Sequence, residues 1–484
     1  MFFRRKIMEQ NQTSGNHTKE VSLLGLSMIV IGSMLGGGVF NLPSSISQSA
    51  GVIASLFAWV ITGVGVFFIA KVFQTLSNEE PEIIGGIYYY AKDGFGDYVG
   101  FNSAWGYWLS NIIGNVSFVI LFLDALSKFI PAIGGSGGQI GLFLGTFMIW
   151  GVVFLVARGI RTASILNTVA TAAKVVPIAL AILLLFIHFK YHIFSMDVFA
   201  KNVLSGGNHL GSVPTQIRHA MLQTMWVFVG IEGAVVLSGR AKRAKDVGRA
   251  TLIGYSTTLA IYVLIVMLSF GTLPQEQLAA LPSPSLSGVL RASTGVWAAR
   301  MIDIGVIISV LGAWISWTIL AAEISFDAAQ DKMFPAFLGK ANKQNAPINA
   351  LILNGVIMQI VFLISRWAMD AFQAVTDTAT TMVLVPYILS AAFLWKVASK
   401  KQHVGQKWLA LGGIIYGIYM LYSSGGLNLL YCVGIYALGF VFWLWNSHTY
   451  KRPIFATKRD KGLFMIVTLL GIISLIVLAI QLHK

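Results

Sequence analysis

The stretch Ile31–Pro43, IGSMLGGGVFNLP, lies inside an apolar run that is long enough to cross a lipid bilayer. Glycine weakens a helix interior, and three consecutive glycines, Gly36, Gly37 and Gly38, favour an interruption of the helix. Close packing through small residues would explain Gly32 and Gly36, but it explains three in a row less well. We therefore predict a broken membrane helix, whose freed backbone groups must line a cavity or meet a ligand.

The composition is that of a membrane protein. Hydrophobic residues make up 56% of the 484 positions and charged residues only 11%. Because lipid offers the backbone no hydrogen bonds, the recurrent apolar runs should be helices. We thus expect an all-α polytopic membrane protein with no separate soluble domain. The net charge of +15 does not indicate nucleic-acid binding, because the basic residues sit in short loops between apolar runs.

The apolar runs predict thirteen spans, whose order defines the organisation of the chain. They lie at residues 21–48, 51–76, 97–127, 138–157, 162–189, 214–239, 249–272, 297–327, 348–365, 370–396, 406–423, 426–446 and 462–482. Lys and Arg are about three times as frequent on one side of this arrangement as on the other, which places the N-terminus in the cytoplasm. An odd number of spans would put Lys484 outside. If one of the last three spans were absent, the C-terminus would instead lie on the cytoplasmic side.

The sixth span supplies a second candidate break, at WVFVGIEGA, residues 226–234. It places Glu232 between two glycines inside an apolar run, and an ionisable group at membrane depth is a functional candidate. The alternatives for Glu232 are a structural salt bridge and a carboxyl that a neighbour keeps protonated. Breaks in spans one and six fit two five-helix repeats of inverted topology, as transporters have. The predicted units are a tail, 1–20; a first repeat, 21–189; an outer loop, 190–213; a second repeat, 214–396; and C-terminal spans, 397–484.

Other polar or aromatic residues lie within the predicted spans. Asn111 and Asn115 share a face of the third span, where they either bond neighbouring helices or line a pocket. Trp317 in the eighth span either packs or stacks on a cationic group. Lys174, in the middle of the fifth, is a salt-bridge partner, a substitute for a bound metal cation, or a proton carrier. No motif for a cofactor, a metal centre or enzymatic catalysis is apparent in the sequence.

At these residues the sequence resembles the amino acid–polyamine–organocation superfamily, and within it the basic amino acid/polyamine antiporters of the arginine/ornithine type. The resemblance rests on GSMLGGGVFNLP (32–43), on WVFVGIEGAVVLSGRAKRAKDVGRAT (226–251) and on AAEISFDAAQDKMFPAFLGKANKQNAPINA (321–350). It covers nearly the whole chain. It implies inverted repeats with spans one and six unwound, and exchange of arginine for ornithine or a related cation by alternating access in a bacterial inner membrane, without a cofactor. A homodimer would also be compatible with it.

The resemblance also implies roles for particular residues. The substrate carboxylate would meet Gly36, Gly37 and Gly38, and its α-ammonium would meet the carbonyls of Met34, Trp226 and Val229. Trp317 would close over the substrate, and Asn111 and Asn115 would lie near its cationic tip. A polar gate on the cytoplasmic path would consist of Tyr107, Glu232 and Tyr387.

Two departures from the family pattern leave alternatives open. Some arginine/agmatine exchangers carry a serine in the glycine run, whereas Gly37 here offers only its backbone. Lys174 lies where sodium-coupled relatives build a cation site, which favours sodium independence but leaves proton coupling open. A proton-coupled permease for lysine, arginine or histidine is therefore one alternative, and a transporter-like nutrient sensor is another.

Overall fold

The computed structural model describes residues 22–80, 83, 87–158, 160–201, 204–205, 208–233, 242–368 and 370–482. Within these ranges, the side chains of residues 160–173, 204–205, 208, 244, 478–479 and 481–482 fall outside the description. The last six residues of the predicted sixth span, 234–239, also lie outside the described residues.

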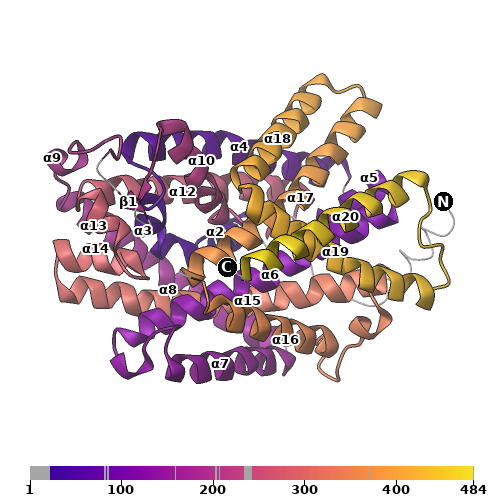
Figure 1. The fold of residues 1–484 in the computed structure, drawn as a ribbon, viewed down its shortest axis with the longest axis horizontal. Helices are drawn as coiled ribbons and strands as arrows, with labels where there is room; N and C mark the ends of the chain where they lie inside the picture. The colour runs from indigo at the N-terminus through magenta and orange to yellow at the C-terminus, as the bar shows by residue number, and fades with distance from the viewer. Residues whose placement is uncertain are drawn as a thin grey trace.

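The chain is helical almost throughout (Figure 1). The helices are α2 (Leu23–Met34), η1 (Gly38–Phe40), α3 (Leu42–Ser47), α4 (Val52–Glu79), α5 (Ile87–Phe95), α6 (Asp97–Ser127), η2 (Pro131–Ile133), α7 (Gln139–Ala157), α8 (Ile160–Ile187), α9 (Tyr191–Phe194), α10 (Val213–Trp226), α12 (Ala244–Phe270), α13 (Gln275–Ala279), α14 (Ser285–Ser293), α15 (Val296–Gln330), η4 (Ala336–Gly339), α16 (Ile348–Ser365), α17 (Ala371–Lys400), α18 (Val404–Ser423), α19 (Gly426–Thr449) and α20 (Lys458–Leu482). One short antiparallel pair, β1 (Leu204–Ser205) and β2 (Asn208–His209), lies in the predicted outer loop.

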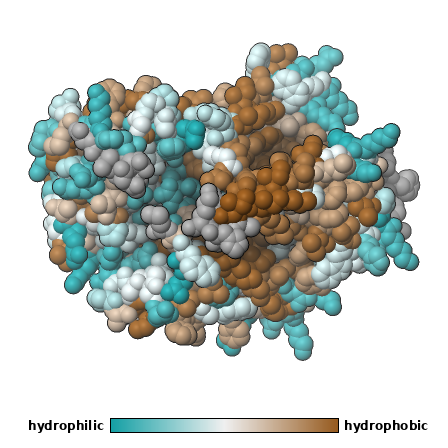
Figure 2. Space-filling model, in the orientation of Figure 1, coloured by the Kyte–Doolittle hydropathy of each residue, from teal (hydrophilic) through white to brown (hydrophobic). Residues whose placement is uncertain are grey.

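Within the described residues, each predicted span contains a helix or a pair of shorter helical pieces. In the described part of the chain, nine helices are long and apolar enough to cross a membrane. Brown, apolar surface gathers over α18, α19 and α20, whereas teal, polar surface lies toward the two ends of the long axis (Figure 2). The fold class is therefore the predicted one, an all-α polytopic membrane protein.

The first span is interrupted at the predicted place. Helix α2 ends at Met34, where the Leu35 N–H makes the last helical bond, to the carbonyl of Ile31 at 2.8 Å. The chain resumes as η1 at Gly38 and as α3 at Leu42, with Pro43 near the start of α3. Proline suits that position because the first turn of a helix does not use its N–H groups.

The glycine run is needed for close approach rather than for a left-handed backbone, because Gly37 has a φ of −73°. A Cβ on Gly37 would lie 2.7 Å from Leu121 Cδ2, and one on Gly38 would lie 2.8 Å from Val227 Cγ1. Both distances are shorter than side chains tolerate. The glycines therefore let the first span press against α6 and against the second predicted break.

The sixth span is also interrupted. Helix α10 ends at Trp226, and residues 227–232 form turns instead of continuing it. Gly230 has a φ of +108°, a backbone conformation that side chains disfavour. The two predicted breaks are thus present, at 35–37 and at 227–232.

Helix α17 carries Pro386 in its interior, which cannot donate to the carbonyl of Met382. The hydroxyl of Tyr436, from α19, donates to that carbonyl at 2.9 Å. The next residue, Tyr387, faces the functional cluster described below. The freed carbonyl is therefore satisfied from a neighbouring helix, and α17 continues past its proline.

Candidate functional site

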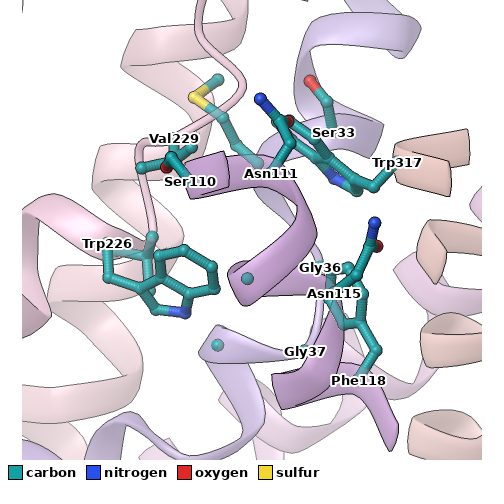
Figure 3. Close-up of a pocket in the computed structure, with 14 residues that line it drawn as sticks. Ser33, Gly36, Gly37, Ser110, Asn111, Asn115, Phe118, Trp226, Val229 and Trp317 are labelled. Carbon is teal, nitrogen blue, oxygen red and sulfur yellow. The ribbon is translucent and has the colours of Figure 1, made fainter. Parts of the chain in front are cut away.

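A cavity lies between the two breaks, and the nine residues that the sequence assigned to substrate binding all line it (Figure 3). They are Met34, Gly36, Gly37, Gly38, Asn111, Asn115, Trp226, Val229 and Trp317. The Trp226 indole faces the cavity from one side, and Gly37, Asn115 and Phe118 lie on the other (Figure 3). The cavity measures about 30 Å³, which is room for one or two waters. An amino acid would therefore need its walls to part.

The break in the first span turns unused backbone donors toward this cavity. The hydrogen bonds found in this turn use the N–H groups of Gly36, Phe40 and Asn41 as donors. Those bonds, within the described chain, do not include the N–H groups of Gly37 and Gly38. Free N–H groups at the start of a helical segment are well suited to an anion such as a carboxylate.

The carbonyls that were predicted to meet an ammonium group differ in their present partners. The Met34 carbonyl already accepts from the Gly36 N–H and from the Tyr262 hydroxyl, both at 2.7 Å. The Trp226 carbonyl accepts from the Val229 N–H at 3.0 Å. The hydrogen bonds of this turn do not use the Val229 carbonyl, in the part of the chain described. Val229 is therefore the most available of the three.

The two asparagines of α6 bring unsatisfied amide groups into the cavity. Asn115 is buried, and neither its oxygen nor its nitrogen has a hydrogen-bond partner among the described residues. Asn111 donates from Nδ2 to the Tyr107 carbonyl at 2.6 Å, which leaves its Oδ1 without a partner there. Buried polar groups normally find a partner, so these amides favour a polar ligand or water between them.

Trp317 reaches the cavity from α15, and the residue is 8% exposed. A Cβ on Gly230 would lie 2.9 Å from Trp317 Cζ2, so the second break makes close contact with this ring. The ring therefore forms a wall of the cavity that packs closely against the backbone at Gly230. Within the described chain, the lining residues include no ionisable side chain, so a cationic group would be bound by amide oxygens and indole faces.

Two side chains tie the breaks together. The Tyr262 hydroxyl, from α12, lies 2.7 Å from the Met34 carbonyl and 2.8 Å from the Val227 carbonyl. The Ser33 hydroxyl donates to the Gly230 carbonyl at 2.9 Å. A hydroxyl carries one proton, so Tyr262 can donate fully to only one carbonyl at a time. Its position thus couples the geometry of one break to that of the other.

We expect Tyr262→Phe to slow the exchange that the family resemblance implies about tenfold while the protein still folds. The variant keeps the ring but leaves a buried carbonyl without its donor, which costs about 1–3 kcal/mol. Initial rates of counterflow in liposomes measure the effect, and thermal unfolding of the purified protein measures the stability. Thr258→Val, a hydroxyl deletion on the same helix, is the matched control. Full exchange by Tyr262→Phe would show that the bridge is dispensable.

The predicted gate residues form one hydrogen-bonded cluster, which we call the tyrosine–glutamate cluster. Glu232 Oε1 accepts from the Tyr107 hydroxyl at 2.7 Å, and Oε2 accepts from the Tyr387 hydroxyl at 2.6 Å. The Gly230 N–H also donates to Oε2, at 3.1 Å. All three side chains are buried. The carboxylate thus connects α6, α17 and the second break, and the alternative of a salt bridge has no cationic partner in the described chain.

Lys174 also contacts the first broken span. Its ammonium donates to the carbonyl of Gly32 at 2.5 Å, two residues before the end of α2. It is buried, and the ion pairs within the described chain do not include it. The salt-bridge interpretation therefore lacks a partner there, and the ammonium instead supports the backbone beside the break.

Sequence reasoning missed several residues of this site. The cavity is also lined by Ser33, Ser110, Gly114, Phe118 and Val227. Ser110 and Phe118 share the α6 face with the two asparagines, and that periodicity alone would have placed them. Tyr262 gives no such signal, because one tyrosine in an apolar span does not reveal which carbonyls it meets.

The family model described as "Amino acid permease" matches residues 21–482. An arginine/ornithine antiporter of Pseudomonas aeruginosa is 40% identical over 475 residues, which cover 95% of this chain and 98% of that protein. An arginine/agmatine antiporter of Chlamydia caviae is 38% identical, with 95% and 97% covered. A Clostridium perfringens protein with the name "Putative amino-acid transporter" is 35% identical, over 96% of this chain and 99% of that protein.

Proposed function

This chain belongs to the amino acid permease family, and on that basis we propose that it is an antiporter that exchanges arginine for ornithine or a related cation. The observation that carries the proposal is the cavity between two interrupted spans, because its groups complement a cationic amino acid. The relatives named arginine/ornithine and arginine/agmatine antiporters support the choice of arginine. No chemical step is part of this function, since the substrate crosses unchanged.

The proposed binding mode assigns each end of the substrate to one part of the cavity. The α-carboxylate meets the N–H groups of Gly37 and Gly38, and the α-ammonium meets the carbonyl of Val229. The side-chain cation lies between the two indoles and the amide oxygens of Asn111 and Asn115. Amide oxygens attract a guanidinium and an ammonium alike, so this pocket suits exchange between arginine and ornithine.

The tyrosine–glutamate cluster serves as the gate on the cytoplasmic side. It closes the path while Glu232 holds Tyr107 and Tyr387 together, and it opens when these bonds break. Lys174, through the Gly32 carbonyl, holds α2 beside the break and replaces a metal cation there.

We place the chain in a bacterial inner membrane, with its N-terminus on the cytoplasmic side. We assign residues 21–189 and 214–396 to the two inverted repeats.

A proton-coupled permease is the competing function, and preloaded liposomes separate the two. An exchanger takes up labelled arginine only when ornithine or arginine is inside, and a proton gradient does not replace that internal substrate. Uptake into empty liposomes that follows an imposed pH gradient would instead establish the permease. Binding of arginine without any flux would favour a sensor.

Removing either indole should weaken transport strongly. We expect Trp226→Leu and Trp317→Ala each to lower kcat/KM for arginine about 30-fold, because a desolvated cation–π contact contributes about 2 kcal/mol. Counterflow in ornithine-loaded liposomes gives the rates. Trp408→Leu is the matched control, since that tryptophan is exposed on α18. Full activity in both cavity variants would refute the proposed pocket.

A further inference from the structure

A second and much larger cavity lies next to the first, at the end of the molecule where the proposed topology places the outside. Its volume is about 290 Å³, and we call it the outer vestibule. Two segments lead from one cavity to the other. In α6, Phe118 lines the central cavity and Ile120 and Asp124 line the vestibule. In the first span, Gly38 lines the central cavity and Asn41 lines the vestibule.

The wall formed by the first span is held by several specific bonds. Asn41 Oδ1 accepts from the Ser285 N–H at 3.2 Å, and the Ser285 hydroxyl accepts from the Ser44 N–H at 3.1 Å. Gln48 donates to the carbonyl of Ala279 at 2.9 Å. These bonds join α3 to α13 and α14, which lie together at the left of Figure 1. The vestibule is thus bounded by ordered backbone.

The charged side chains of the vestibule do not neutralise one another. Its lining contains Asp124, Asp370 and Arg366, and the ion pairs within the described chain include none of them. Asp124 accepts from the Ser136 N–H at 2.9 Å, and Asp370 caps α17 by accepting from the Gln373 N–H at 2.9 Å. Each carboxylate therefore accepts a hydrogen bond from a backbone N–H. Lys128, exposed one helical turn beyond Asp124, is the nearest cation along α6.

Arg366 is only partly satisfied. It donates from Nη2 to the Gly137 carbonyl at 2.7 Å, whereas its Nε is buried and has no partner in the described chain. A guanidinium offers five N–H donors and suits a carboxylate, which binds it through two parallel bonds. This arginine therefore has donors left for an anionic group.

We infer that the outer vestibule is a second binding site for a cationic amino acid, which the substrate occupies before it reaches the central cavity. Arg366 binds the α-carboxylate, and Asp124, the more buried of the two carboxylates, binds the side-chain cation. Asp370, at the exposed rim, faces the α-ammonium. The inference rests on the proposed function and topology. It adds that the chain selects cationic substrates in the vestibule, before they reach the central cavity, whose lining has no charged side chain.

The test compares two substrates and two sides of the membrane. Asp124→Asn keeps an oxygen to accept from Ser136 but removes the charge, so we expect the external KM for arginine to rise about fivefold, the scale of a partly exposed ion pair. The external KM for citrulline, whose side chain is neutral, should change less than twofold. The KM measured from the cytoplasmic side, in inside-out vesicles, should stay the same. Arg366→Gln should raise the external KM for both substrates. Arg366→Lys keeps the charge but not the two parallel bonds, so it should recover only part of the lost affinity.

Glu276→Gln is the matched control, because Glu276 is an exposed carboxylate on α13 that does not line the vestibule. An equal effect of Glu276→Gln, an equal rise for citrulline, or an unchanged arginine KM in Asp124→Asn would overturn the inference. Failure of the proposed function looks different, since the wild-type protein would then show no ornithine-dependent uptake. In that case, the vestibule is tested by binding of labelled arginine to wild-type and Asp124→Asn protein in nanodiscs. Equal binding by the two proteins would overturn the inference that the vestibule binds arginine.

Discussion

Replacing Gly38 with valine is expected to reduce arginine/ornithine exchange at least about a hundredfold, a loss of about 2.7 kcal/mol of transition-state stabilisation. A Cβ at this position would lie 2.8 Å from Val227 Cγ1 and 3.2 Å from Trp226 Cδ1. Valine adds two further carbons to that Cβ, so the two breaks must separate. The separation also withdraws the Gly37 and Gly38 N–H groups from the carboxylate that we place there.

Gly151→Val is the matched control for this variant. A Cβ on Gly151 would meet no atom within 4 Å, and the residue lies exposed on α7. The control should exchange at the wild-type rate. Counterflow is the measurement, and size-exclusion chromatography with a thermal unfolding curve checks that both variants fold. Wild-type exchange in Gly38→Val would mean that the substrate passes elsewhere.

The second large effect is expected from Glu232→Gln. The carboxylate accepts from two tyrosine hydroxyls and one backbone N–H, whereas the amide nitrogen of glutamine can only donate. One tyrosine therefore loses its acceptor inside a buried cluster, and a hydrogen bond to a charged group contributes about 1.5–3 kcal/mol. We expect exchange to fall more than tenfold and uncoupled efflux, into medium without substrate, to rise. Glutamine does not titrate, so the dependence of exchange on pH should also change shape.

Tyr107→Phe and Tyr387→Phe serve as comparison variants, because each removes one bond to Glu232 and keeps the carboxylate. They should show smaller losses of exchange and should retain the wild-type pH profile. Efflux and exchange are measured on the same liposomes, with and without external arginine. An unchanged pH profile and tight coupling in Glu232→Gln would remove Glu232 from the gate.

The parts of the structure that depend on local sequence were predictable. The run of three glycines located the first break, and the apolar runs at 97–127 and 348–365 gave the bounds of α6 and α16 as they stand. The glycines beside Glu232 located the second break, although residues 234–239 lie outside the described part of the chain. The gathering of Tyr107, Glu232 and Tyr387 was inferred from the family resemblance, not from their spacing.

Contacts between distant segments were not predictable. Ser33 meets Gly230 across 197 positions, and Tyr262 meets Met34 across 228. No periodicity or motif encodes such pairs, since they follow from how the helices pack. The outer vestibule also escaped prediction, because its charged residues come from α6, from the end of α16 and from the start of α17. In the sequence, each of them is an ordinary charged residue near the end of a span, with no sign that the three line one cavity.

The most direct test is a structure of the protein with arginine bound, solved in nanodiscs. The account predicts density for the α-carboxylate within hydrogen-bond distance of the Gly37 and Gly38 N–H groups, and density for the guanidinium between Trp226, Trp317 and the two asparagines. Continuous helices through residues 31–38 and 226–233, or arginine bound away from both breaks, would contradict it.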